Sequence, residues 1–295
     1  MIFDYQFRNY NFRALIYMIL LSVLGILVVG SASNQDRSSV IKQIIGVVVS
    51  LIICLVLSLI DYHQYFRFTT LIYVVCAGML AAVLLFGRTT KGATRWLRIG
   101  GIQIQPSEFV KIGLILILAN FLSRNREKIN EPKTLGMTAL ICALPVGMVY
   151  LQPNLSTTIV ICFMILCMIY VAGISYKWIA GAVAVGVPGF AALIYLSLQG
   201  FIPFLQKYQA QRIMGKIFHS SSEFTDLNRQ QDNSMMAIGS GQLRGKGLFN
   251  NTLSSVKNGN FLSEEQTDFI FAVIGEELGF VGGVAVIALY ALLVY

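Results

Sequence analysis

The sequence is short of charge and of metal-binding residues. Only 12% of its 295 residues are charged, about half of the ~25% that soluble domains carry. The two histidines, His63 and His219, lie far apart and match no metal motif. The five cysteines all fall inside apolar runs, without the spacing of a disulfide framework or a zinc site. These shortages exclude an ordinary soluble domain, and we interpret the cysteines as small buried residues.

The sequence is rich instead in long apolar runs. It is 56% hydrophobic with a mean hydropathy of +0.70, and a membrane span needs about 20 apolar residues. The predicted spans are Ala14–Ser33, Val40–Ile60, Thr69–Gly87, Pro106–Ser123, Leu135–Leu151, Leu155–Gly173, Trp178–Leu198 and Phe269–Tyr295. With no internal repeat and no low-complexity linker, the pattern predicts an all-α, polytopic transmembrane helical bundle that forms one domain over residues 1–295.

The distribution of Lys and Arg predicts how the chain is oriented. With the N-terminus in the cytoplasm, the inside segments carry eight of these residues and the short outside loops carry five or six. This orientation makes residues 199–267 a large extracellular loop and places Asp268 outside. The net charge of +8 then suits membrane lipid head groups or an anionic lipid substrate, rather than nucleic acid.

The large loop holds two patterns. Phe204–Phe218 interleaves apolar residues with Lys207, Arg212 and Lys216, which is typical of a basic amphipathic helix at the membrane surface. The alternative is a solvated loop helix. Ala237–Leu248 has four glycines, which allow the backbone to turn sharply and to approach a ligand closely, but their spacing is not that of a nucleotide-binding motif.

Asp268 is the first candidate for catalysis. It lies between the polar end of the loop and the apolar run that begins at Phe269. A carboxylate at the mouth of a membrane helix borders a low-dielectric region and is still reached by water, so it can act as a base. The alternative is that Asp268 is the N-cap of the helix.

Cations gather in the segment Arg88–Gln105. Lys91, Arg95 and Arg98 surround Trp96, a combination that suits a phosphorylated amphipathic ligand, because the cations bind phosphate and the indole lies at head-group level. An ordinary anchor loop at the membrane surface is the alternative.

Two further sets of charges lie inside predicted spans, where ionisable residues are costly. Glu108 and Lys111 share a helix face, as a structural ion pair or as a substrate contact. Glu276 and Glu277 have no local cation, so we expect them to face a cavity or to pair with a basic residue from another helix.

Four sequence blocks resemble one known family. They are GATRWLRIGG followed by QPSEFVKI, then QPNLST, AIGSGQLRGKG and EEQTDFIFAVIGEELG. In order and spacing they are similar to the SEDS family of shape, elongation, division and sporulation proteins, which includes RodA, FtsW and SpoVE. The resemblance spans essentially the whole chain, and the third block is closer to the RodA branch.

The resemblance implies a peptidoglycan glycosyltransferase of the bacterial cytoplasmic membrane that polymerises lipid II at the outer face during elongation or division. It also implies a partner, a class B penicillin-binding protein that acts as transpeptidase, and it places the catalytic aspartate at Asp268. The lipid II contacts would come from Lys91, Arg95, Trp96, Arg98, Glu108 and Lys111, with Arg212 a weaker candidate. A divalent cation, Mg²⁺ or Mn²⁺, could assist the pyrophosphate leaving group, although the sequence has no ligand cluster. The alternatives are a flippase for lipid-linked precursors and a non-catalytic activator of the penicillin-binding partner.

The chain departs from the family pattern at several positions. Asn154 and Ser156 replace an aspartate and a glycine, Gln242 replaces a glycine, and Gln266 replaces a histidine. The family fold has ten spans, of which this chain holds about eight, so we expect the reading frame to continue past Tyr295 through two further spans.

Overall fold

The computed structural model is almost entirely helical. It describes residues 10–33, 36–90, 93–99, 102–152, 154–199, 225–250, 255, 262 and 265–295. All the predicted spans form helices: α1 (Phe12–Ala32), α2 (Arg37–Ser58), α4 (Thr69–Phe86), α5 (Pro106–Arg124), α6 (Pro132–Leu151), α7 (Leu155–Val171), α8 (Tyr176–Leu198) and α11 (Ile270–Val294). Shorter helices are α3 (Tyr62–Arg67), the 3₁₀ helix η2 (Arg126–Lys128) and α10 (Thr225–Ser240). The predicted fold class is confirmed.

The surface of these helices suits a membrane. Among the described residues, six helices are long and apolar enough to cross one, and α7 is apolar but shorter, at Leu155–Val171. No residue of α2 is buried against protein, and the helix is almost entirely apolar from Ile44 onward. Helices satisfy their own backbone hydrogen bonds, so they are the form in which such a segment can lie in lipid.

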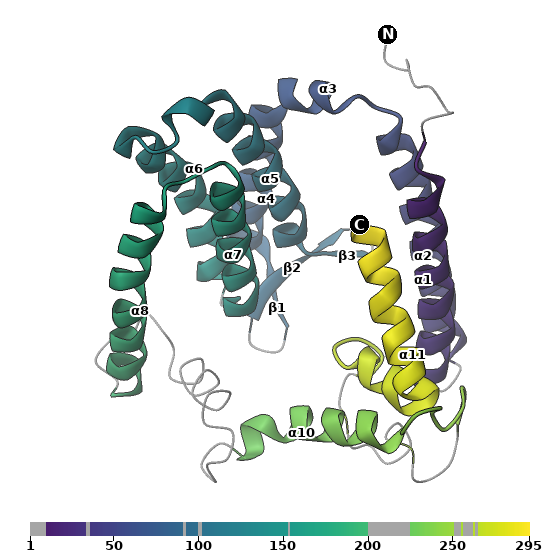
Figure 1. Cartoon of the computed structure of the whole chain (residues 1–295). Coiled ribbons are helices and arrows are strands. Elements are labelled where there is room, and N and C mark those ends of the chain that lie inside the picture. Colours follow the sequence, from purple (N-terminus) through teal and green to yellow (C-terminus); the bar gives the residue numbers. More distant parts are fainter. Residues whose placement is uncertain are drawn as a thin grey trace. The chain divides into compact units, whose positions relative to one another are not determined.

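The chain divides into two compact units, which we describe separately (Figure 1). The middle unit comprises Asp61–Gln209, and the terminal unit comprises Met1–Ile60 together with Ala210–Tyr295. The prediction of one domain over residues 1–295 stays a prediction.

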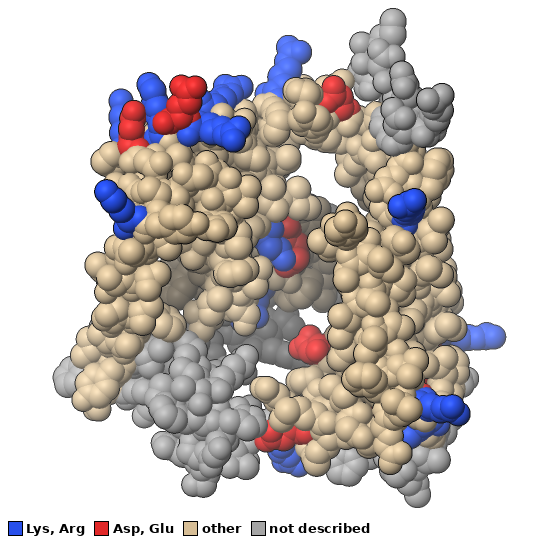
Figure 2. All heavy atoms as spheres, in the orientation of Figure 1, with Lys and Arg blue, Asp and Glu red and all other residues tan. Residues whose placement is uncertain are grey.

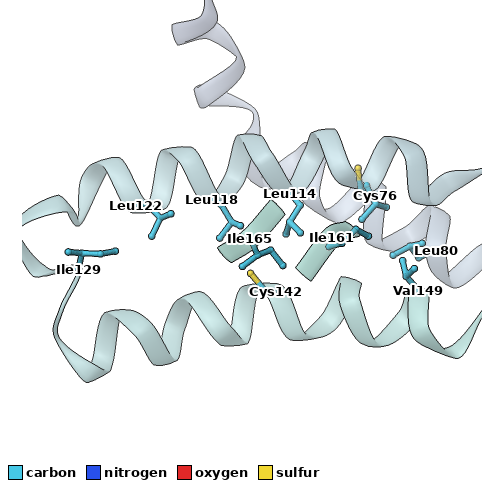
Figure 3. Packing of buried hydrophobic residues seen from close by; sticks show 11 residues of the cluster. Cys76, Leu80, Leu114, Leu118, Leu122, Ile129, Cys142, Val149, Ile161 and Ile165 are labelled. Atoms are coloured by element: carbon cyan, nitrogen blue, oxygen red, sulfur yellow. The ribbon is translucent and has the colours of Figure 1, made fainter. Parts of the chain in front are cut away.

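Helices α4, α5, α6 and α7 form the core of the middle unit. Leu114, Leu118 and Leu122 recur at every fourth residue of α5 and point toward Cys142 and Ile165 (Figure 3). This spacing puts them on one face of the helix. Helix α5 comes very close to α4 at Gly113. A Cβ atom added to this glycine would lie only 2.7 Å from the Sγ of Cys76. Small residues allow this approach between membrane helices.

A small antiparallel sheet connects α4 to α5. Its strands are β1 (Arg88–Thr90), β2 (Ala93–Ile99) and β3 (Ile102–Ile104), in the order β1-β2-β3. Leu97 lies opposite Ile104, and Arg98 lies opposite Gln103. The sequence predicts only a loop here, because the strands are short and interrupted by glycine. Strand β2 lies against α4 and α5, so the sheet holds the cationic segment next to the first turn of α5.

Positive charge gathers at one end of the middle unit, over η2 and the adjoining ends of α5 and α6 (Figure 2). Arg124, Arg126, Lys128 and Lys133 are all exposed there. The predicted orientation places these residues on the cytoplasmic side, where Lys and Arg are enriched in membrane proteins.

In the terminal unit, α11 packs against α1 and α10, and α1 packs against α2. Val28 and Ala32 of α1 are buried against Val273, Ile274 and Val286 of α11. Helix α10 lies in the segment that the sequence predicts as one large loop. The predicted surface helix Phe204–Phe218, with Arg212, lies outside the described residues.

Candidate functional site

Asp268 lies in the turn that precedes α11. The helix begins at Ile270 with Phe269 in the N-cap position, and no side chain caps it. The alternative interpretation of Asp268 as the N-cap is therefore wrong: the aspartate lies one residue too early. Its side chain is exposed, and no described residue makes a hydrogen bond or an ion pair with it. Solvent and a ligand can therefore reach the carboxylate.

Helix α11 is broken at Gly279. This residue has φ 68° and ψ −165°, a combination that essentially only glycine adopts. The break divides α11 into a first half, Ile270–Leu278, and a second half that runs on to Val294. The first half begins next to Asp268, and its Ala272 packs against Ala237 of α10.

The glycine-rich segment 241–247 fills the break. The N–H groups of Lys246 and Gly247 donate to the carbonyls of Glu276 and Glu277, each at 2.9 Å. In the other direction, the N–H of Phe280 donates to the carbonyl of Gln242 at 2.8 Å, and the N–H of Val281 to that of Leu243 at 3.2 Å. The two backbones therefore meet along four hydrogen bonds.

Glycine makes this approach possible. A Cβ atom on Gly241 would collide with the carbonyl oxygen of Gly275, and one on Gly245 with that of Glu277. Gly245 also has φ +76°. Close backbone approach is the role that the sequence predicts for this segment, but the partner is α11 rather than a ligand.

The two glutamates beside the break are buried, each 2% exposed. Glu276 accepts a 2.7 Å charged hydrogen bond from the Nζ of Lys246. Glu277 accepts a 2.6 Å hydrogen bond from the Oγ of Ser31 at the end of α1, and this Oγ accepts in turn from the N–H of Phe249 at 3.1 Å. The sequence predicts that these glutamates face a cavity or pair with a basic residue from another helix, whereas the structure gives Glu276 a basic partner from the glycine-rich segment.

Only part of the predicted cationic cluster can be located. Arg95 and Trp96 are half-buried on β2, and as neighbours in a strand they point to opposite faces. Arg98 is on the same strand, and Lys91 lies outside the described residues. The sheet thus brings Arg95, Trp96 and Arg98 to the start of α5.

Glu108 and Lys111 pair with each other in the first turns of α5. The Nζ of Lys111 lies 2.7 Å from Oε2 of Glu108, and the side chains are 28% and 53% exposed respectively. Because both side chains remain partly exposed, an anionic ligand could take the place of Glu108 on Lys111.

The hairpin between α6 and α7 buries two polar side chains. Asn154 is the N-cap of α7, where its Oδ1 accepts from the N–H of Thr157. Gln152 donates to the carbonyl of Leu80 on α4. Asparagine caps a helix about as well as aspartate, so the change from the family's aspartate to Asn154 preserves this turn.

No group of three His, Cys, Asp or Glu side chains that could hold a metal ion occurs among the residues that the structure describes.

Sequence reasoning missed the partnership between Lys246 and Glu276 and the contact of Ser31 with Glu277. In the sequence these partners are separated by 30 and 246 residues. The sequence nonetheless contained a signal, because two glutamates inside an apolar run without a nearby cation need hydrogen-bond donors from elsewhere in the chain.

Comparison with known proteins gives consistent matches. The model of the FtsW/RodA/SpoVE family, described as cell cycle proteins, matches residues 12–295. The peptidoglycan glycosyltransferase MrdB of Escherichia coli K12 is 35% identical over 282 residues, which are 95% of this chain and 72% of MrdB. FtsW of Shewanella sediminis, named a probable peptidoglycan glycosyltransferase, is 32% identical over 94% of this chain and 66% of its own length.

Two solved structures have the same fold. A chain from a peptidoglycan synthase complex that coordinates polymerization and crosslinking superposes with a TM-score of 0.74 at 25% identity, over 97% of this chain and 76% of the other. The rod shape determining protein RodA of Thermus thermophilus superposes with a TM-score of 0.64 at 24% identity, over 97% of this chain and 73% of RodA.

Proposed function

Since this chain belongs to the FtsW/RodA/SpoVE family and is a peptidoglycan glycosyltransferase, we propose that it polymerises lipid II with Asp268 as the general base. The observation that carries the proposal is the position of Asp268: an exposed carboxylate at the start of a membrane helix, with no hydrogen bond or ion pair to a described residue. Such a carboxylate can accept a proton from a substrate hydroxyl.

The reaction joins two lipid-linked disaccharides at the outer face of the cytoplasmic membrane. The 4-hydroxyl oxygen of the acceptor sugar attacks the anomeric carbon of the donor, and Asp268 takes the hydroxyl proton. The bond from the anomeric carbon to the pyrophosphate oxygen breaks, and the electron pair leaves with undecaprenyl pyrophosphate. A single displacement of this kind inverts the anomeric centre.

Cations are needed where negative charge develops on the pyrophosphate. We assign this role to Arg95, Arg98 and Lys111 of the middle unit, with Trp96 at the level of the lipid head group and Glu108 as the resting partner of Lys111. Lys91 and Arg212 remain candidates, although they lie outside the described residues. A divalent cation would enter with the substrate phosphates, as Mg²⁺ commonly does, and no step here depends on one.

The cell would use this activity in shape or division. We propose a class B penicillin-binding protein as partner, supported by the likeness to a chain of a complex that couples polymerization to crosslinking. We also propose that the N-terminus is cytoplasmic and that Asp268 faces outward, which places the base on the side where the glycan is assembled.

The test is replacement of Asp268 in the protein expressed from its intact reading frame. Asp268→Asn and Asp268→Ala should each lower turnover of purified lipid II by about 10²–10⁴-fold, since neither side chain can act as a base. Both should melt like the wild type, because Asp268 caps no helix. Asp36→Asn is the matched control: an exposed aspartate of the same unit that should keep full turnover. An active Asp268→Asn enzyme would exclude the proposed base.

A further inference from the structure

The break in α11 exchanges one set of backbone hydrogen bonds for another. In an unbroken helix the N–H of each residue donates to the carbonyl four positions earlier, so Phe280 and Val281 would donate to Glu276 and Glu277. In this structure both pairs are separated, and all four groups bond to the glycine-rich segment instead. Two hydrogen bonds within the helix are thus replaced by four to residues 242–247.

The break depends on the segment. Glu276 and Glu277 are buried, and in an apolar membrane helix such as α11 every backbone polar group needs a partner within the protein. Here each of the four groups has one from residues 242–247. If the segment withdrew, closing the helix through Gly279 would pair the four groups with one another again. The first half of α11 would then change direction, and Asp268 would move with it.

Two further features affect how firmly the segment is held in the break. Lys246 forms an ion pair with Glu276 on the first half of α11. The carbonyl that accepts from Phe280 belongs to Gln242, which has φ 49°. A positive φ disfavours residues other than glycine by about 1–2 kcal/mol. The segment is thus held by a charge pair and loosened by one unfavourable residue.

We propose that the segment 241–247 is a positioning element for Asp268: by inserting into the hydrogen-bond ladder of α11, it fixes the direction of the half-helix that follows Asp268. Gly279, Lys246 and Glu276 are then positioning residues. The proposal rests on Asp268 being the base, but the inserted ladder itself can be tested without any activity.

The test combines amide hydrogen exchange with kinetics in the full-length protein. Gly279→Ala disfavours the broken helix, because alanine does not tolerate that conformation. The amides of Lys246 and Gly247 should then exchange at least about tenfold faster, while those of Phe280 and Val281 stay protected by closure of the helix. Gly283→Ala is the control, since its added Cβ would meet only a ring atom of Phe271 at 3.5 Å, and it should leave all four amides unchanged.

Turnover provides the second measurement. Gly279→Ala should lower kcat for lipid II by at least about tenfold with little change in KM, since the base is misplaced while the phosphate contacts remain. Gln242→Gly acts in the opposite direction, because glycine adopts a positive φ without strain. It relieves the positive φ, so the amides of Lys246 and Gly247 should exchange more slowly, with turnover equal to the wild type or higher.

The outcomes separate the possibilities. If all four amides lose protection together in Gly279→Ala, the segment has only a structural role and the proposal is wrong. If Gly279→Ala does not fold, Gln242→Gly decides: unchanged exchange of Lys246 and Gly247 would contradict the insertion. An active Asp268→Asn enzyme would exclude Asp268 as the base, but it would not change the hydrogen-exchange results. The failure of one proposal can therefore be distinguished from the failure of the other.

Discussion

Helices α5 and α11 carry charge near their starts in opposite ways. In α5 the helix is unbroken, and Glu108 pairs with Lys111 one turn away, with both side chains partly exposed. In α11 the helix is broken at Gly279, and the buried Glu276 pairs with Lys246, 30 residues distant in sequence. One pair lies within a single helix, whereas the other joins two segments.

The difference teaches what each pair is suited to do. An exposed pair within a helix contributes little to stability, so Lys111 can leave Glu108 for a substrate phosphate at low cost. Removing one partner of a buried pair strongly destabilises the protein. Glu276 and Lys246 are therefore suited to hold the glycine-rich segment against α11. This contrast supports substrate contact at α5 and positioning at α11.

The largest effect is expected when the ion pair between Glu276 of α11 and Lys246 is broken. Glu276→Gln should destabilise the protein by about 3 kcal/mol, since it removes the buried carboxylate of the ion pair with Lys246. Glu108→Gln, the matched change at α5, should cost only about 0.5 kcal/mol. Thermal melting of the detergent-purified variants measures both. Equal melting temperatures for the two variants would contradict the assignment of different roles.

A second prediction concerns turnover rather than stability. Arg95→Gln and Lys111→Gln should each lower lipid II turnover about tenfold, or about 1.4 kcal/mol, while the proteins purify and melt normally. Arg95→Lys should rescue only in part, because lysine lacks the planar fork of arginine. Arg126→Gln, at the charged end of the same unit, is the control. Wild-type turnover in both site variants would leave the cationic segment as a membrane anchor only.

The sequence predicted those parts of the fold that local patterns determine. Long apolar runs predicted the membrane helices, and the order and spacing of the four sequence blocks led to the family and to Asp268. The start of α5 was also readable, since Glu108 and Lys111 are separated by one helical turn. Each of these features depends on residues near one another in the chain.

Features that depend on distant contacts were not predicted. The break in α11 depends on the close packing of Gly279 against segment 241–247. No local sequence pattern predicts which backbone segment will pack against a glycine. The small sheet was missed because its strands β1 and β3 have three residues each, below the length at which alternation is recognisable. The alternative interpretation of Asp268 as the N-cap was wrong by one position, an error typical of helix boundaries.

A third prediction compares two close contacts: that of α4 with α5 at Gly113, and that of segment 241–247 with α11 at Gly241. On α5, alanine at Gly113 would meet the Sγ of Cys76 at 2.7 Å, a side-chain atom that can move, so the cost should be about 1 kcal/mol. At α11, alanine at Gly241 would meet backbone carbonyls, which cannot move, and should cost more. Adding Cys76→Ala should restore the melting temperature of Gly113→Ala. Gly78→Ala, with no atom near its added Cβ, is the control for α4.

The smallest expected effect compares how two helices of the terminal unit begin. Helix α11 has no side-chain cap, whereas Asp36 caps α2 by accepting from the hydroxyl and N–H of Ser39 and the N–H of Ser38. The hydrogen bond from the Ser39 hydroxyl, followed by those from the two N–H groups, lowers the pKa of Asp36. A lowered pKa in the folded state means that the cap stabilises the protein fully above the ordinary aspartate pKa of about 3.9, and that this stability is lost as the pH falls through the folded value. Asp36→Asn can still cap α2 but does not titrate.

The difference in melting temperature between wild type and Asp36→Asn should therefore be constant near neutral pH and shift against the wild type below about pH 4. Parallel melting curves through that range would mean that the hydrogen bonds of Asp36 do not favour its ionised form.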